Sequence, residues 1–230
     1  MPNASMKDTS SLRDYQAFIA AVYGQNNERH FNIDEMLTNI SRFAMRGLKG
    51  IRKDDREKIR INMVIAVSWF LSLMNQLGVD LEDAVWNRFP YLCSYCGECP
   101  CACKNKKVHK RSKAKIDQHL RPKTIKALQT MFNDIYPAEA RTLEHAGIHL
   151  AEEVGELSEA VLRFRGHHRD EDLKQVVLEA SDLFSCFMGV FNSLGFDYSK
   201  ELARLFSNGC HVCKKTPCAC AYDAVVNFRS

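Results

Sequence analysis

The sequence lacks the features that would place the protein in a membrane or in the secretory pathway, and it lacks a large excess of positive charge. Its longest apolar run, MVIAVSWFLSLM, is well short of the roughly 20 apolar residues needed to cross a bilayer. The opening residues, MPNASMKDTSSLRDYQ, contain no apolar stretch of signal-peptide length. The 32 basic and 28 acidic residues leave a net charge of only +4, too small an excess to indicate a dedicated nucleic-acid binder. We therefore expect a soluble, cytoplasmic protein.

The sequence also lacks the alternation of apolar and polar residues that is typical of strands. Its apolar residues recur at helical spacing instead. The segment 123–136 predicts one helix, and longer helices are expected over 141–165 and 170–194, with a short one after residue 197. The fold class predicted is all-α, a helical bundle with a cysteine-rich loop after its last helix.

Cysteine is concentrated in two short clusters that contain all but Cys186 of the ten cysteines. Both clusters read C-x2-C-x4-C-x-C, and each cysteine of the second lies 117 positions after its counterpart in the first. The matching residues are Cys93, Cys96, Cys101 and Cys103 in the first cluster, and Cys210, Cys213, Cys218 and Cys220 in the second.

The same offset continues upstream of the cysteines without a gap. Identical pairs at this spacing are Ser68 and Ser185, Phe70 and Phe187, Asn75 and Asn192, Gly78 and Gly195, and Asp80 and Asp197. Self-similarity at one fixed offset predicts a duplicated unit. We expect one repeat over 1–103, a Lys-rich linker over 104–121 and a second repeat over 122–230, each repeat ending in its cysteine loop.

Four thiolates within eleven residues are typical of a structural, tetrahedral zinc site. An iron–sulfur cluster or a redox-active disulfide pair is the alternative. Cys99 corresponds to Thr216 in the second repeat, so it is expected not to be a ligand. The sequence leaves open whether each loop closes its own site or the two loops exchange halves.

Acidic residues interrupt the apolar stripes of the two long helices of the second repeat. In LAEEVGELSEAV, Glu153 and Glu156 fall at helical spacing beside the stripe, and Glu179 and Asp182 do so in the next helix. Carboxylates facing a bundle interior repel one another unless a cation neutralises them, and Mg²⁺ or Mn²⁺ prefers such oxygen ligands. The alternative is that these are exposed acids paired with neighbouring basic residues.

These acids form an E-E-x-x-E stretch at Glu152, Glu153 and Glu156, followed by E-x-x-D at Glu179 and Asp182. The pattern resembles the MazG-type all-α nucleoside triphosphate pyrophosphohydrolases, over roughly residues 124–206. The resemblance implies Mg²⁺-dependent cleavage of a nucleoside triphosphate into the monophosphate and pyrophosphate. It also implies metal ligation by the last four of these acids, with Glu152 and Glu153 as catalytic residues. Glu152 would either orient the attacking water or complete the metal's ligand shell.

Basic residues lie between the two acidic helices, in RFRGHHRDEDLK. They are candidate contacts for a triphosphate, although a charge-balanced solvated turn is the alternative. Asn192 is a further candidate, but its recurrence as Asn75 indicates a structural role equally well. The candidate substrate-binding residues are Arg163, Arg165, His168, Lys174 and Asn192.

The first repeat has lost the acids. The positions that correspond to Glu153, Glu156, Glu179 and Asp182 hold Met36, Asn39, Asn62 and Ile65, and only Glu35 keeps its acid. We therefore expect a non-catalytic first repeat. Because MazG-like subunits pair, the two repeats are expected to form a pseudo-dimer within the chain, with further self-association left open. The alternative function is a non-enzymatic, zinc-stabilised adapter, or a nucleic-acid-binding module that uses the basic linker and RGLKG at 46–50.

Overall fold

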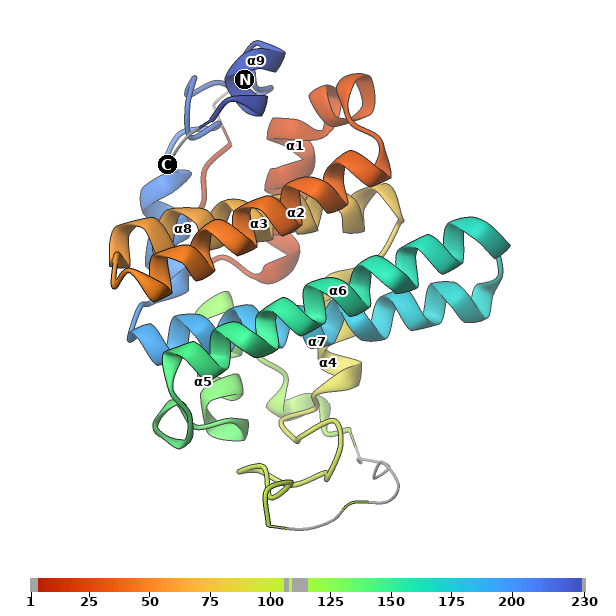
Figure 1. The fold of residues 1–230 in the computed structure, drawn as a ribbon, viewed down its shortest axis with the longest axis vertical. Helices are drawn as coiled ribbons and strands as arrows, with labels where there is room; N and C mark the ends of the chain where they lie inside the picture. The colour runs from red at the N-terminus through yellow and green to blue at the C-terminus, as the bar shows by residue number, and fades with distance from the viewer. Residues whose placement is uncertain (1–3, 106–107, 109–115, 229–230) are drawn as a thin grey trace. The chain divides into compact units, whose positions relative to one another are not determined.

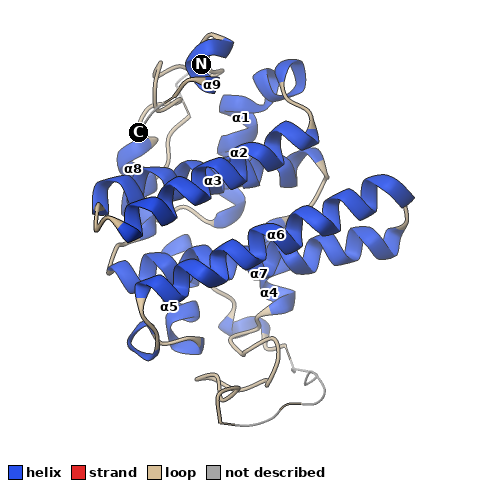
Figure 2. Cartoon of the chain, in the orientation of Figure 1, coloured by secondary structure: helices blue, strands red, loops and turns tan. Residues whose placement is uncertain are grey.

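The computed structural model describes residues 4–105, 108 and 116–228, and within these ranges the chain is built of helices and loops without strands (Figure 2). The all-α class is therefore confirmed. Much of the expected basic linker lies outside the described residues. The helices are α1 (Leu12–His30), α2 (Ile33–Arg52), α3 (Arg56–Gln76), α4 (Leu81–Arg88), α5 (Ile125–Ile135), α6 (Leu143–His167), α7 (Asp170–Leu194), α8 (Tyr198–Leu205) and α9 (Tyr222–Val226), with short 3-10 helices at Gln118–Leu120 and Ala138–Ala140.

The described chain divides into two compact units whose limits differ from the expected domain boundaries. Unit 1 combines residues 1–80 with 198–230, and unit 2 is formed by residues 81–197. The expected boundaries at 103 and 122 both fall inside unit 2. As a result, α4 and the first cysteine loop belong to unit 2 with α5–α7, whereas α8 and the second cysteine loop belong to unit 1 with α1–α3. The helix before each cysteine loop, α4 in the first repeat and α8 in the second, therefore belongs to the unit that contains the core helices of the other repeat.

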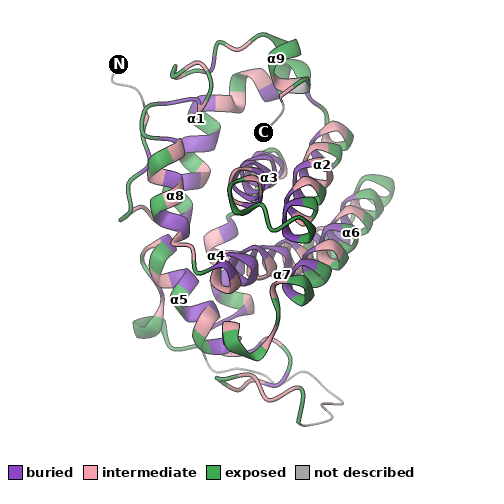
Figure 3. Cartoon of the chain, turned by 60° about the vertical axis from the view of Figure 1, so that its left-hand side comes forward, coloured by how far each residue is buried: buried purple, intermediate pink, exposed green. Residues whose placement is uncertain are grey.

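Unit 1 is organised around α3, which is buried along most of its length (Figure 3). Helices α2 and α3 lie side by side, and α1 and α8 also contact α3. The helices begin where the sequence provides capping side chains. Ser11 and Asp14 form a capping box at the start of α1, and Asn32 and Glu35 form another at the start of α2.

Unit 2 is organised around the long pair α6 and α7 (Figure 1). Helices α4 and α5 contact α7, and aromatic rings fill the space among them, with Phe132 against both Phe89 and Phe184. The Thr124 hydroxyl accepts a hydrogen bond at the start of α5, as Thr142 does at the start of α6. This unit contains every acid of the candidate metal site.

The helices expected in the second half of the sequence are confirmed to within about two residues. Helix α7 ends at Gly195, which has a positive φ of 67° and so adopts the left-handed conformation that favours glycine. Helix α6 continues past Gly166, where we expected its end, because His168 takes the left-handed capping position with φ of 55°.

The same hydrogen-bonded arrangement recurs in the two units, which extends the internal correspondence beyond the sequence match. In each unit, an Asn near the end of the core helix (α3 or α7) donates its side-chain amide to the backbone carbonyl of a Gln on α1 or α5. That Gln in turn donates its side-chain amide to a backbone carbonyl that follows the core helix. The bonds are Asn75 Nδ2 to Gln16 O (3.0 Å) and Gln16 Nε2 to Val79 O (2.6 Å), and Asn192 Nδ2 to Gln129 O (3.1 Å) and Gln129 Nε2 to Phe196 O (2.7 Å). Helices α1 and α5 correspond at an offset of 113, and the later segments correspond at 117.

Among the described helices, none by itself is both long enough and apolar enough to cross a membrane. Helices α3 and α4 reach that combination only when they are counted together across the break between them. The buried face of α3 accounts for its apolar character, since its side chains form the interior of unit 1.

Candidate acidic site and cysteine clusters

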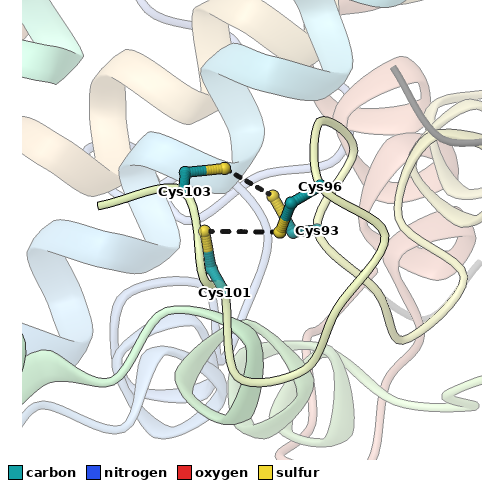
Figure 4. Close-up of side chains that lie close together, drawn as sticks. All are labelled: Cys93, Cys96, Cys101 and Cys103. Atoms are coloured by element: carbon teal, nitrogen blue, oxygen red, sulfur yellow. Dashed lines mark hydrogen bonds between the residues drawn. The ribbon is translucent and has the colours of Figure 1, made fainter. Parts of the chain in front are cut away.

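Each cysteine loop brings its own four thiols together, so the two loops do not exchange halves. Figure 4 shows Cys93, Cys96, Cys101 and Cys103 pointing toward a common centre. The Sγ atoms of Cys93 and Cys103 are 3.7 Å apart, and those of Cys96 and Cys101 are 4.0 Å apart. The second loop has the same arrangement, with 3.8 Å both between Cys210 and Cys220 and between Cys213 and Cys218.

These sulfur separations match a mononuclear metal site. Four Zn–S bonds of about 2.3 Å in a tetrahedron place the sulfur atoms about 3.8 Å apart. A disulfide would require about 2.05 Å, and all the cysteines are free thiols. Cys99 is exposed and lies outside both clusters, as expected. Both clusters can therefore hold Zn²⁺.

The two loops have the same backbone conformation and the same attachment. The amide of Cys93 donates to Glu98 O (3.1 Å), and the amide of Cys210 donates to Lys215 O (3.1 Å), at the same offset of 117. Each loop is also hydrogen-bonded to a helix of its own unit, the first loop to α5 and the second to α1. The bonds are Cys101 N to Ile135 O (2.8 Å) at the end of α5, and Cys218 N to Val22 O (2.7 Å) within α1.

The surroundings of the first cysteine in each loop favour its thiolate. Burial is the largest influence on Cys93 and opposes ionisation, but hydrogen bonds from Tyr136 and from backbone amides outweigh it and lower the pKa to about 7. At Cys210 the hydrogen bond from Cys218 is the largest influence and lowers the pKa to about 4. Thiolates are the form that binds metal.

Three of the predicted acids converge between α6 and α7. Oxygen atoms of Glu153, Glu179 and Asp182 all lie within 4.8 Å of one another. Glu153 comes from α6, and the other two lie one turn apart on α7, so the packing of the two helices creates the cluster. Glu156, one turn after Glu153, is exposed and lies outside this group. Glu152 is also exposed, and its Oε2 is 3.1 Å from His149 Nδ1.

The acidic cluster has more negative charge than the neighbouring positive charge can balance, and the pKa values of Glu153 and Glu179 are raised. Burial, followed by the charges of Asp182, Glu156 and Glu179, raises the pKa of Glu153 to about 8. Burial also raises the pKa of Glu179, to which Gln175 donates a hydrogen bond. The Oε2 atom of Glu153 is buried and has no hydrogen-bond partner among the described residues. A buried oxygen in this state is disfavoured unless a further group binds it.

Arg88 is part of the acidic cluster, and sequence reasoning missed it. Its Nε donates to Asp182 Oδ1 over 3.0 Å and its Nη2 donates to Asp182 Oδ2 over 2.6 Å. This bidentate pairing, with two parallel hydrogen bonds, is a particularly strong interaction between Arg and a carboxylate. Arg88 is the last residue of α4, which belongs to the first repeat of the sequence, and the corresponding position of the second repeat is Leu205.

The predicted substrate contacts are not gathered at the acids. Arg163 lies ten residues along α6 from Glu153, about 15 Å at 1.5 Å per residue, and its side chain pairs with Glu159. Arg165, His168 and Lys174 are exposed near the same α6–α7 turn. The basic group therefore lies at the far end of the helix pair, where a triphosphate contact stays a prediction.

Asn192 lies at the opposite end of α7 and is committed to a structural bond. Its Oδ1 accepts from Gln129 Nε2 over 2.9 Å, and its Nδ2 donates to Gln129 O over 3.1 Å. Both halves of the amide are thus paired with α5. The equivalent bond from Asn75 in unit 1, which has no acidic cluster among the described residues, favours the structural alternative.

A second guanidinium lies on the same face of α7 as Asp182. Arg141 rests against Gly189, where an added Cβ would come within 2.5 Å of Arg141 Nη2. Its Nε is buried without a hydrogen-bond partner, and burial lowers its pKa. Cys186 lies between Gly189 and Asp182 along the helix, and burial, with the charge of Glu153, raises its pKa to about 12.

The corresponding place in unit 1 is apolar. Met36 and Ile65 are buried where the second repeat has Glu153 and Asp182. Glu35, the one acid retained, bonds to the Asn32 amide in the capping box of α2. A cavity of about 70 Å³ lies here, lined by Ile65, Trp69 and the C-terminal Phe228 among others. Its lining contains no set of oxygen ligands for a divalent ion.

Comparison of the chain with protein-family models, curated proteins and solved structures finds no match. The functional argument for this protein therefore depends on the chemistry of the acidic cluster and the cysteine loops themselves.

Proposed function

We propose that this protein is a Mg²⁺-dependent nucleoside triphosphate pyrophosphohydrolase of the MazG-like type, which releases a monophosphate and pyrophosphate. The observation that carries the proposal is that three carboxylates from α6 and α7 converge, with their oxygen atoms within 4.8 Å of one another. They lie in the repeat that resembles the family. Deoxynucleoside triphosphates are included in the proposed substrate class. The active centre would lie in unit 2 alone.

The residues present suit a hard divalent ion. Oxygen donors are what Mg²⁺ and Mn²⁺ prefer, and the buried Glu153 Oε2 lacks the partner that such an ion would supply. Glu153, Glu179 and Asp182 would hold the ion. Glu156 would join them by rotation of its side chain, since its charge already raises the pKa of both Glu153 and Glu179. When bound, the ion would polarise phosphate oxygens and lower the pKa of a water.

The remaining carboxylate of the motif would act beside the ligands. Glu152 lies on the exposed side of α6, and its carboxylate is close to the imidazole of His149. A carboxylate in such a position can orient a water molecule for attack without binding the metal. Its assignment as a catalytic residue with Glu153 stays a prediction from the resemblance.

We also propose that the two repeats are fused copies of one MazG-like unit that form an intramolecular pseudo-dimer. Supporting this, the last helix and cysteine loop of each repeat belong to the compact unit that contains the core helices of the other. The two cysteine clusters would bind structural Zn²⁺ and so stabilise the two loops. Each loop is also hydrogen-bonded to a helix of the unit that it joins, α5 for the first loop and α1 for the second. The first repeat would be non-catalytic because it lacks the ligands.

A non-enzymatic adapter or nucleic-acid-binding module is the competing function. It would need the cysteine clusters and the basic linker, but it has no use for three carboxylates gathered between packed helices. Such a cluster would only destabilise a binding module, because neighbouring half-buried acids repel one another.

A nucleotide screen separates the two functions. Common and chemically damaged nucleoside triphosphates should be incubated with the protein and Mg²⁺, and pyrophosphate and monophosphate should be measured. Glu153→Gln and Glu179→Gln should abolish turnover while keeping side-chain size. Glu35→Gln, in the capping box of the first repeat, is the matched control and should keep turnover. Absence of pyrophosphate release across the whole screen, or equal loss in the control, would contradict the proposal.

A further inference from the structure

We propose that Arg88 is a built-in counter-cation that competes with the divalent ion for Asp182, so that the ion binds more tightly when a triphosphate is also bound. This inference rests on the proposed function, since it concerns the regulation of the same site. It assigns the first repeat an active part in the chemistry of the second, through a residue that the catalytic pattern of acids does not contain.

The geometry shows that Arg88 and a metal ion would claim the same atoms. Both carboxylate oxygens of Asp182 are engaged, at 3.0 Å by Nε and at 2.6 Å by Nη2 of Arg88. The Asp182 side chain is only 17% exposed and that of Arg88 only 9%. Because little water reaches the pair, its attraction is screened far less than that of a surface ion pair. A metal ion that binds Asp182 must therefore displace the guanidinium or share a carboxylate with it.

The charge that Arg88 supplies is insufficient for the cluster as a whole. One guanidinium faces three carboxylates, and the buried Oε2 of Glu153 remains without a partner. The guanidinium thus stabilises the metal-free site in part, but it leaves some of the negative charge of the three acids unbalanced. A divalent ion would add the missing charge, and Arg88 next to it would then be repelled.

An arginine displaced from Asp182 would need another anion close by. Its side chain is nearly buried at the end of α4, and a buried guanidinium without a partner is strongly disfavoured. Its planar fork of donors suits phosphate oxygens as well as it suits a carboxylate. The triphosphate is the anion that would arrive together with the metal. Arg88 would therefore exchange Asp182 for phosphate when both bind, and each would raise the affinity of the protein for the other.

The position of Arg88 in the sequence fits this assignment. It lies on the segment that the first repeat contributes to unit 2, and the equivalent residue of α8 in unit 1 is Leu205. In unit 1 the residue corresponding to Asp182 is the buried Ile65. The repeat position that holds arginine in unit 2 thus holds leucine in unit 1, where the acid is also replaced by an apolar residue.

Metal binding without nucleotide is the direct test. Protein with zinc-loaded cysteine clusters should be titrated with Mn²⁺, and free Mn²⁺ followed by its paramagnetic resonance signal. Arg88→Leu introduces the side chain found at the equivalent position of the other repeat, and Arg88→Lys keeps the charge without the fork. Arg13→Leu, which breaks an exposed Arg–Asp pair in unit 1, is the control. Melting curves establish that each variant is folded.

We expect Arg88→Leu to bind Mn²⁺ about tenfold more tightly than the wild type when no nucleotide is present, a change within the usual range of coupling between sites. Arg88→Lys should fall between the two, and the control should match the wild type. In excess Mn²⁺, the uncleavable α,β-methylene analogues of the four common nucleoside triphosphates should bind Arg88→Leu more weakly than the wild type. Unchanged or weaker Mn²⁺ binding by folded Arg88→Leu would overturn the proposal.

The failure of this inference is distinguishable from the failure of the proposed function. If the wild type releases pyrophosphate but Arg88→Leu gains no Mn²⁺ affinity, only the competition by Arg88 is wrong. If Arg88→Leu gains Mn²⁺ affinity but no nucleotide is bound or cleaved by the wild type, the competition for Asp182 is supported and the link to a triphosphate is overturned.

Discussion

The hydroxyl group of Tyr136 donates a hydrogen bond to Sγ of Cys93 over 3.4 Å, and this bond joins the end of α5 to the first cysteine cluster. Tyr23 has the equivalent position in unit 1, since Tyr23 and Tyr136 follow the helix residues that anchor the two loops. Tyr23 lowers the pKa of Cys210 by hydrogen bonding and also contacts His211 Nδ1 at 3.1 Å. The two tyrosines are therefore partners of the thiols that would bind metal.

Tyr136→Phe should weaken Zn²⁺ binding at the first cluster by roughly tenfold, because groups that hydrogen-bond to metal ligands typically contribute that much to affinity. Without the hydroxyl, the pKa of Cys93 should rise and its thiolate should form less readily. Competition with a chromogenic chelator measures the change. Tyr23→Phe should affect only the second cluster, and a loss shared equally by both clusters in either variant would contradict the assignment.

Purified protein should contain two Zn²⁺ ions per chain, one in each four-cysteine cluster. Cys210→Ser should remove one equivalent in elemental analysis, whereas Cys99→Ser should remove none, because Cys99 lies outside the clusters. Stripping the metal should lower the melting temperature, since metal binding is coupled to the folding of the loops. Added Mg²⁺ should not restore it, because a hard ion prefers oxygen to thiolate. Thiols paired as disulfides, with no zinc present, would contradict this prediction.

Asn192→Ala should destabilise the protein by about 1–3 kcal/mol, the usual cost of leaving buried hydrogen-bonding groups without partners. The loss arises because Gln129, which is 8% exposed, bonds to both halves of the Asn192 amide. Asn75→Ala should cost a similar amount in unit 1. Urea unfolding measures both. If Asn192 bound substrate instead, its replacement would raise KM with little change in stability, and the two variants would not behave alike.

The positions of the helices were predictable because they depend on local information. Periodicity and capping residues placed the helix at 170–194 correctly, and Gly195 marked its end. The convergence of Glu153, Glu179 and Asp182 was also predictable, since all three follow the inner faces of consecutive helices that pack together.

The exchange of α4 and α8 between the units was not predictable from the same information. The two segments have matching apolar positions, so their sequences do not indicate which core helices each terminal helix packs against. The pairing of Arg88 with Asp182 depends on this exchange and joins residues 94 positions apart. No local pattern signals such a pair. The one sequence feature that could have suggested it is that the first repeat has Arg88 where the second repeat has Leu205.

The raised pKa of Glu153 predicts that the metal-free protein loses stability as pH increases. Its folded-state pKa of about 8 is above the ordinary 4.5, so the folded protein holds a proton that the unfolded chain releases. The stabilising contribution is full below about pH 4.5 and is lost as pH rises to about 8. Glu153→Gln, which cannot ionise, should therefore be more stable than the wild type at pH 8, by on the order of 1 kcal/mol because the side chain is only partly buried.

The comparison should be made by urea unfolding at pH 5 and pH 8, with zinc retained and in buffer that contains no Mg²⁺. Glu159→Gln, an exposed position on the same helix, is the control and should show no such dependence on pH. Excess Mg²⁺ should reverse the ranking at pH 8, because the ion binds the ionised wild-type carboxylate and stabilises the folded state. It should also release protons on binding, which makes the heat of binding depend on the buffer. A Glu153→Gln variant less stable than the wild type at pH 8 without Mg²⁺ would show that the carboxylate is not opposed by its neighbours.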